Sequence, residues 1–130
     1  MNVPTVLIVD DEPLARWSVT ETLRDCGYRV TSAADAAGAM RAMAEPGKQP
    51  DVVLLDLVLP DSGNLDVLSA IHQASPASSV VLITAYGTSE LFDEARRRGA
   101  FASVDKPFEM SDLSPLVERA LAARQETASV

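Results

Sequence analysis

The sequence predicts an α/β domain in which a parallel sheet of five strands carries helices on both faces. Short apolar runs alternate with longer amphipathic stretches five times along the 130 residues. Each run has the length of a strand and each stretch has the length of a helix. Five such β–α repeats favour a parallel sheet with crossover helices. The length suits one domain, which we place at residues 1–124, and residues 125–130 read as a polar tail or the start of a linker.

The expected strands are the runs rich in Val, Ile and Leu. They lie at 5–9, 28–32, 51–55, 79–83 and 100–104. Three of them, 5–9, 51–55 and 79–83, lack polar alternation, which is typical of central strands buried on both sides. The run at 28–32 is more polar and is therefore expected at an edge.

The expected helices are bounded by residues that favour helix ends. Pro13 suits the first turn of one helix and Asp35 the N-cap of the next, while Gly27 and Gly99 suit the position just after a helix. The helices are expected at 13–26, 35–45, 64–75, 87–98 and 111–124.

Composition excludes several classes of protein. A net charge of -8 argues against direct nucleic-acid binding, which needs clustered Lys and Arg. The single cysteine, Cys26, excludes an internal disulfide and is interpreted as a small buried residue, which fits a reducing compartment. The N-terminus lacks the basic region of a signal peptide, and no apolar run approaches the length of a membrane span. The expectation is a cytoplasmic protein with no membrane contact.

Polar residues follow four of the five expected strands. Asp10 and Asp11 come after the first, Asp56 after the third, Thr84 after the fourth and Lys106 after the fifth. In open parallel sheets the ligand crevice lies outside the carboxyl ends of the strands, so these side chains share one edge. With strand order 2-1-3-4-5, the acids of the first and third strands become neighbours.

Three clustered carboxylates need a compensating positive charge. Each pair repels by about 4 kcal/mol at 4 Å and an effective dielectric near 20. An all-oxygen cluster suits Mg²⁺, which also accepts a phosphate oxygen as a ligand. Lys106 and Thr84 supply partners for the far side of a phosphoryl group. Asp56 is then a carboxylate nucleophile able to form an aspartyl phosphate.

Each of these residues also has a plain structural interpretation. Asp11 suits a helix cap, Asp56 a turn, Thr84 a satisfied hydroxyl at a strand end and Lys106 a solvated loop charge. Taken singly, these interpretations carry as much weight as the functional one. Five residues of the correct type at one sheet edge favour a joint function.

Four segments together resemble the receiver domain of two-component response regulators. They are "LIVDDEP", "DVVLLDLVLPDSG", "VVLITAYG" and "GAFASVDKPF", and the resemblance covers residues 4 to about 124. It implies a single-domain flavodoxin-like (βα)5 fold. "TAYG" and "KPF" further resemble receivers of enhancer-dependent transcription activators, although no effector domain lies in these residues.

The resemblance implies a role for each residue of the motifs. Asp56 would accept a phosphoryl group from a sensor histidine kinase or phosphotransfer protein. Asp10, Asp11, the Asp56 carboxylate and the Val58 backbone carbonyl would hold Mg²⁺. Thr84 and Lys106 would contact the phosphoryl oxygens, and Lys106-Pro107 resembles the family's cis peptide.

The switch region departs from the family pattern. Ser103 stands where the family has an aromatic residue, and Phe101 lies two residues earlier, roughly 6–7 Å along the strand and on the same face. We hypothesise that switching is rerouted through Tyr86.

Asp105 is interpreted as an exposed loop carboxylate. Val58 and Tyr86 flank the implied line of water attack, which predicts a long-lived phosphoryl state.

The remaining surface predictions concern partners. The helix 87–98 is thinly apolar and can shift at modest cost. This suits the output face that the resemblance implies, made of the fourth helix, fifth strand and fifth helix, which would also serve a homodimer. Trp17 suits either docking of a kinase helix or partial burial, and His72 is interpreted as a surface residue.

Three other functions are compatible with an α/β sheet of this layout. An aspartate-nucleophile phosphatase requires a D-x-D motif after the first strand, which "VDDEP" does not provide in that context. A flavin-binding protein requires a Ser/Thr/Gly-rich phosphate loop where the acids stand. A degenerate receiver that binds partners without phosphorylation is favoured by Ser103 and opposed by the complete acid set and Lys106.

Overall fold

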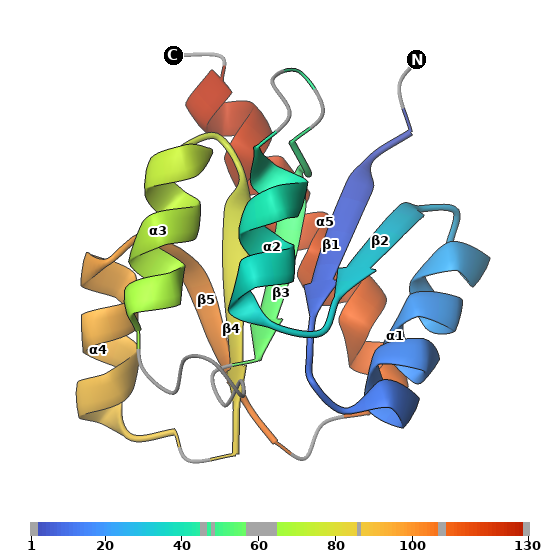
Figure 1. Cartoon of the computed structure of the whole chain (residues 1–130), viewed down its shortest axis with the longest axis horizontal. Coiled ribbons are helices and arrows are strands. Elements are labelled where there is room, and N and C mark those ends of the chain that lie inside the picture. The colour runs from blue at the N-terminus through green and yellow to red at the C-terminus, as the bar shows by residue number, and fades with distance from the viewer. Residues whose placement is uncertain are drawn as a thin grey trace.

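In the computed structural model the chain forms one parallel sheet with helices on both faces (Figure 1). The structure describes residues 3–44, 47, 49–56, 65–85, 87–106 and 109–128. The strand order β2-β1-β3-β4-β5 confirms the predicted fold class. The strands are β1 (Thr5–Val9), β2 (Arg29–Ala33), β3 (Val52–Asp56), β4 (Ser79–Thr84) and β5 (Ala100–Asp105). The helices are α1 (Pro13–Asp25), α2 (Ala36–Met43), α3 (Asp66–Ala74), α4 (Ser89–Arg97), the short 3₁₀ turn η1 (Met110–Asp112) and α5 (Leu113–Ala128).

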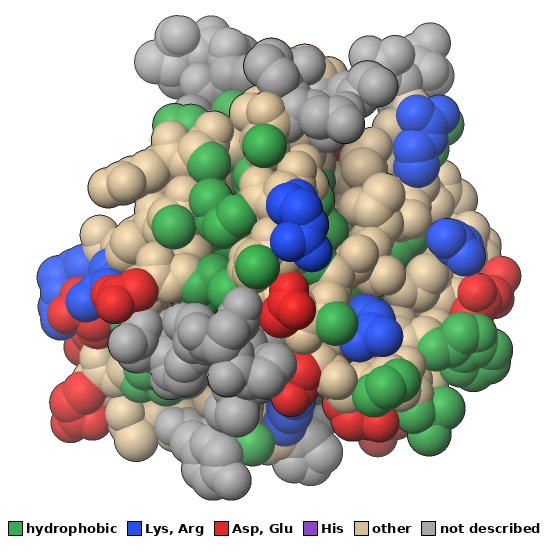
Figure 2. Space-filling model, viewed as in Figure 1, with side chains coloured by type: hydrophobic (Ala, Val, Ile, Leu, Met, Phe, Trp, Pro, Cys, Tyr) green, Lys and Arg blue, Asp and Glu red, His purple; other side chains and the backbone are tan. Residues whose placement is uncertain are grey.

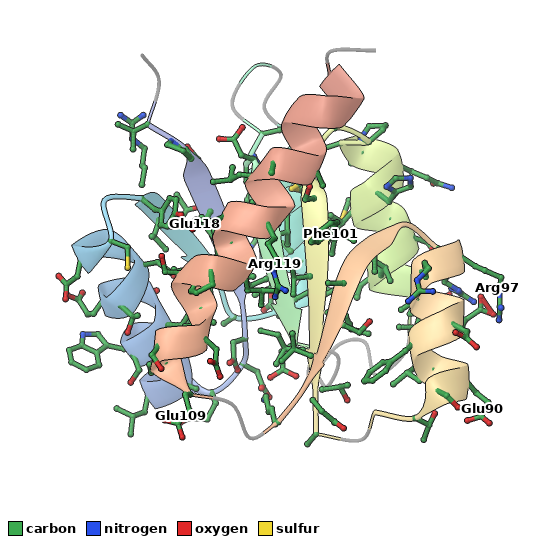
Figure 3. All side chains as sticks on the ribbon, turned by 180° about the vertical axis from the view of Figure 1, so that it is seen from behind. Glu90, Arg97, Phe101, Glu109, Glu118 and Arg119 are labelled. Atoms are coloured by element: carbon green, nitrogen blue, oxygen red, sulfur yellow. The ribbon has the colours of Figure 1, made fainter. Side chains whose placement is uncertain are left out.

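The sheet separates two apolar cores. Helices α2, α3 and α4 cover one face, and α1 and α5 cover the other (Figures 1 and 3). Successive residues of β3 alternate between them, so that Val53 packs in the first core and Leu54 in the second. β3 and β4 are buried along their whole length, which confirms the prediction of central strands. The acids at the strand ends therefore stand at the rim of a low-dielectric interior.

The helix ends are formed as local chemistry predicts, with one difference. Asp35 caps α2 by accepting a 2.7 Å hydrogen bond from the Gly38 amide, and Pro13 occupies the first turn of α1. The N-cap of α1 is Glu12, whose carboxylate accepts from the amides of Leu14 and Ala15. The alternative role of Asp11 as this cap is therefore wrong, and its carboxylate is left to the strand-end cluster.

Several strands end later than predicted. β2 and β3 are displaced by one residue, and β4 and β5 each continue by one residue. As a result Asp56, Thr84 and Asp105 are the last residues of strands, so their backbones are fixed by the sheet.

Two exposure predictions are wrong. Cys26 is exposed, because it follows the last buried residue of α1, Leu23, at the helix end. His72 is not a plain surface residue: it is half-buried, and its ring lies against Gly99.

Candidate functional site

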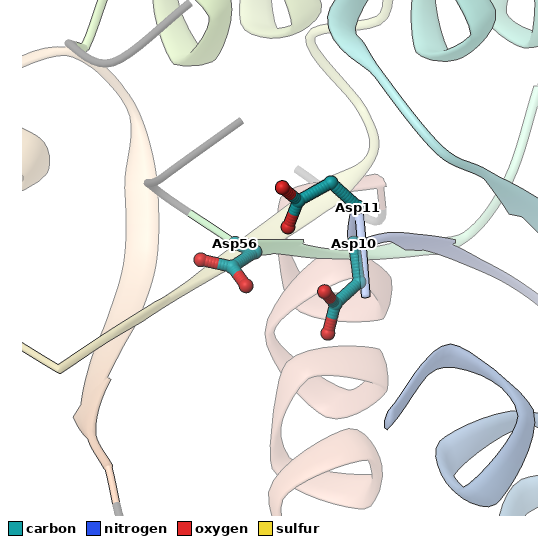
Figure 4. A group of neighbouring side chains, drawn as sticks. All are labelled: Asp10, Asp11 and Asp56. Carbon is teal, nitrogen blue, oxygen red and sulfur yellow. The ribbon is translucent and has the colours of Figure 1, made fainter. Parts of the chain in front are cut away.

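Three carboxylates converge at the carboxyl ends of β1 and β3 (Figure 4). One oxygen from each of Asp10, Asp11 and Asp56 lies within 4.8 Å of the others. Asp10 and Asp56 are buried, with 8% and 6% of their surface exposed, whereas Asp11 is exposed. The pairing of β1 directly with β3 brings the acids together, as the predicted strand order requires.

The electrostatics of the cluster shows most clearly at Asp10. Burial raises the pKa of this carboxyl above its usual value of 3.8, and the neighbouring Asp56 raises it further. The Glu12 amide, which donates a 3.0 Å hydrogen bond to Asp10, and the Lys106 ammonium both act in the opposite direction. The raised pKa thus reflects first the burial of Asp10 and then its nearness to a second carboxylate.

Lys106 brings a positive charge to the cluster. Its Nζ lies 3.0 Å from Asp56 Oδ2, and this ion pair joins the ends of β3 and β5 across the intervening strand β4. The backbone amide of Lys106 donates a 2.8 Å hydrogen bond to the Thr84 carbonyl, which fixes the lysine to the end of β4. Asp56, the buried acid that ends the apolar strand β3, is thus paired with Lys106.

Thr84 lies at the predicted sheet edge and is completely buried. It pairs in register with Asp105, and its strand neighbour Ile83 pairs with Asp56. The five predicted site residues are therefore brought together from the ends of four strands.

The donor set fits a magnesium ion. All three side chains offer carboxylate oxygens, the ligand type that Mg²⁺ prefers. Oxygens bound to one Mg²⁺ are about 3–4 Å apart, because the metal–oxygen distance is about 2.1 Å. The 4.8 Å limit of the cluster is slightly wider than this, so small side-chain rotations would complete the site.

A cavity of about 300 Å³ opens beside the acids, and sequence reasoning missed it. Apolar side chains of both the strands and α1 form its walls, while Asp10, Asp56 and Lys106 line its polar side. The cavity gives a small group space beside the buried carboxylates of Asp10 and Asp56. The cavity forms where α1 and η1 pack against the strand ends. Because it depends on this tertiary packing, no local sequence motif predicts it.

The switch residues differ from their prediction in part. Phe101 is 39% exposed and stands where the register between β4 and β5 shifts. This irregularity interrupts the two-residue alternation, since Ala100 packs in the first core and Ala102 against the second, and the shared face of Phe101 and Ser103 stays a prediction. Ser103 is half-buried. Asp105 is exposed as predicted but belongs to β5 rather than a loop, and its carboxylate accepts a 3.2 Å hydrogen bond from the Gly87 amide.

Three predicted residues lie outside the described part of the chain. They are Val58, Tyr86 and Pro107. The Val58 metal ligand, the rerouting through Tyr86, the long phosphoryl lifetime and the cis peptide therefore stay predictions.

Comparison with known proteins gives one consistent family. The family model described as "Response regulator receiver domain" matches residues 6–118. The chain is 32% identical over 121 residues to the DNA-binding transcriptional regulator NtrC of Azospirillum brasilense, covering 93% of this chain and 25% of the relative. It is 38% identical to the transcriptional regulatory protein PdtaR of Mycobacterium tuberculosis, covering 93% and 58%. The chain thus spans less than two thirds of these relatives.

Solved structures agree with the sequence comparison. A CheY-like response regulator receiver domain protein from Methanospirillum hungatei JF-1 superimposes with a TM-score of 0.89 and 25% identity, covering 97% of this chain and 99% of that one. NtrX from Brucella abortus superimposes with a TM-score of 0.85 and 34% identity, covering 98% and 28%. With its fold, its strand-end residues and its family match in agreement, the chain belongs to the response regulator receiver domain family.

Proposed function

We propose that this chain is a phosphoacceptor signalling module, which receives a phosphoryl group on Asp56 and switches its conformation in response. The observation that supports this most directly is the buried Asp56 carboxylate, held 3.0 Å from Lys106 and within one cluster with Asp10 and Asp11. Such a carboxylate is fixed in place, while its cationic partner is positioned to accept further negative charge.

The proposed reaction is a direct phosphoryl transfer. A carboxylate oxygen of Asp56 attacks the phosphorus of a donor, forming a P–O bond as the bond to the donor breaks. The donor group, the imidazole nitrogen of a phosphohistidine, leaves with the electron pair of that bond. Lys106 is within reach of both the carboxylate and the arriving oxygens, and it offsets part of the added charge of about -2. The chain takes part in its own phosphorylation and dephosphorylation and turns over no external substrate.

Asp10, Asp11 and Asp56 would hold Mg²⁺ in this state. The ion supplies charge neutralisation for the phosphoryl oxygens. The close approach of three carboxylate side chains supports this role, because a cation would offset their mutual repulsion.

The proposed phosphodonor partner is a sensor histidine kinase or a phosphotransfer protein. Exposed apolar side chains gather on α1, at the lower right of Figure 2, where Leu14 is 67% and Trp17 is 61% exposed. Pro13, the first residue of α1, follows Asp11 by only two positions. A donor helix seated on this surface would therefore present its phosphohistidine close to the acid cluster.

The proposed output face consists of α4, β5 and α5. β5 is an edge strand that carries the partly exposed Phe101, and Arg97 and Arg119 lie on the flanking helices (Figure 3). This face would control a downstream transcriptional output and serve a homodimer, without direct nucleic-acid contact by this acidic domain. Across the helices that the structure describes, none is both long and apolar enough to span a bilayer. We propose the cytoplasm as the location.

The test is the intact mass after incubation with acetyl phosphate and Mg²⁺. We expect the wild type to gain one phosphoryl mass and Asp56→Asn to gain none. Asp93→Asn, which changes an acid on α4, is the matched control and should behave as the wild type. EDTA should suppress the gain. No gain from either acetyl phosphate or a phosphohistidine donor, with the fold intact, would instead favour the phosphorylation-independent binding module.

A further inference from the structure

We propose that Asp105 latches the connection between β4 and α4 in the resting state, and that phosphorylation of Asp56 releases this latch. The inference rests on the proposed function and names the device that would carry its signal. It assigns a positioning role to Asp105, which follows from the contacts of its carboxylate with Gly87.

The latch consists of Asp105, Gly87 and Phe92. The Asp105 carboxylate accepts a 3.2 Å hydrogen bond from the Gly87 amide, which ties the end of β5 to the segment that precedes α4. The Phe92 ring covers Gly87 so closely that a Cβ built on Gly87 would lie 2.8 Å from Phe92 Cε1 and 2.9 Å from Asp105 Oδ1. A side chain at Gly87 would therefore have to displace the Phe92 ring and the Asp105 carboxylate, although the φ of Gly87 is not among the positive values.

The two ends of α4 are held differently. Near its C-terminal end, Arg98 forms a 3.0 Å ion pair with Asp66 of α3 and lies 3.4 Å from Ser69 Oγ, and Gly99 lies against the His72 ring. Its N-terminal end, near Glu90 in Figure 3, lies at the same edge of the sheet as the acid cluster. Of the nine residues of α4, all of them described, Ala95 alone is buried. The helix can therefore pivot about its C-terminal end once its N-terminal end is released.

Backbone contacts connect the latch to the phosphoacceptor. Asp105 directly precedes Lys106, whose side chain pairs with Asp56 and whose amide donates to the Thr84 carbonyl. Gly87 follows Thr84 by three residues. A movement of Thr84 and Lys106 toward new phosphoryl oxygens therefore shifts both sides of the Asp105–Gly87 hydrogen bond. That bond is exposed and long, so releasing it costs little.

Amide hydrogen exchange of residues 87–92 tests the latch. In the unphosphorylated protein we expect Asp105→Ala and Gly87→Ala to speed exchange of this segment roughly twofold to tenfold, the range of one net hydrogen bond. Asp105→Asn keeps an acceptor oxygen and should lie closer to the wild type. Asp93→Ala, which removes an acid from α4 itself, should change nothing.

Phosphorylation by acetyl phosphate separates a latch from a merely structural contact. We expect it to speed exchange of the segment in the wild type but to add little in Asp105→Ala, where the latch is already open. Equal exchange in the resting wild type and Asp105→Ala would overturn the proposal, and so would an equal phosphorylation effect in both. If the wild type takes up no phosphoryl group, the proposed function fails, whereas the comparison of resting proteins still decides whether the latch exists.

Discussion

Replacing Asp10 by Asn should stabilise the metal-free protein and abolish its response to Mg²⁺. At the 4.8 Å limit of the cluster, two carboxylates repel by about 3.5 kcal/mol at an effective dielectric of 20 and about 0.9 kcal/mol in water. The substitution also loses the attraction of Asp10 for Lys106, which offsets part of this gain. The amide oxygen of the new side chain can still accept from the Glu12 amide. We therefore expect a net stabilisation of about 1 kcal/mol, or roughly 3–5 °C in Tm.

Urea unfolding with EDTA and with Mg²⁺ measures this effect. In EDTA the Asp10→Asn variant should have the higher free energy of unfolding, while Mg²⁺ should stabilise only the wild type, because a ligand of the folded state shifts the equilibrium by mass action. Asp93→Asn controls for the loss of one acidic charge outside the cluster. A variant less stable than the wild type in EDTA would refute the reasoning, since it would mean that the Asp10 carboxylate contributes more through its hydrogen bond than it costs by repulsion.

The same pair of proteins gives a pH dependence whose sign follows from the raised pKa of Asp10. A carboxyl whose pKa is higher in the folded than in the unfolded state favours folding while it is protonated, and this contribution is lost as pH rises through the folded pKa. In EDTA, the advantage of Asp10→Asn should therefore be small below pH 3.8 and grow as pH rises above that value. It should become constant once Asp10 is ionised, and an advantage that shrinks with rising pH would contradict the raised pKa.

Individual contacts outside the acid cluster predict three further outcomes. Gly99→Ala should lower the free energy of unfolding in urea by about 2–4 kcal/mol, because φ is +111° and the new Cβ would lie 2.5 Å from His72 Cγ. Gly27→Ala is the control, with φ of +96° and open space, and should lower it by only about 1–2 kcal/mol. Equal losses of stability in the two variants would contradict a role for His72. Asp35→Ala should lower stability by about 1 kcal/mol, since it removes the hydrogen bond to the Gly38 amide, and an unchanged urea midpoint would show that the cap contributes nothing. Trp17→Ala should slow phosphotransfer from a kinase but leave acetyl phosphate labelling unchanged, because Trp17 is exposed on α1 outside the acid cluster. Equal slowing with both donors would instead place the effect of the substitution at Asp56.

Strand patterns and strand-end residues are enough to predict most of the acid site. The apolar runs predict the buried strands, and Asp10, Asp11, Asp56 and Lys106 follow those runs in the chain, so parallel topology alone brings them to one edge. The cap of α1 is harder to predict, because Asp11 and Glu12 are adjacent and both can accept from helix amides. The structure decides this by giving the hydrogen bonds to Glu12.

Exposure of side chains beyond the core is predicted less well, because it depends on neighbours that are distant in the chain. The sequence pattern places His72 at the surface, yet Gly99, at the end of α4, packs against its ring. The pattern also assumes an unbroken alternation along β5, yet a register shift against β4 interrupts it between Ala100 and Ala102. Neither the partner of His72 nor the bulge leaves a local signal in the sequence.

Hydrophobic periodicity and strand-end position are properties of the chain alone, and they suffice for the α/β class, the order of its elements and the set of residues at the strand-end site. The contacts that those residues make are settled only in the folded molecule. The ion pair of Lys106 with Asp56 and the hydrogen bond of Asp105 with Gly87 each join segments that are far apart in sequence, 50 and 18 residues respectively. Such contacts depend on the register between strands, which is set by the packing of both cores at once.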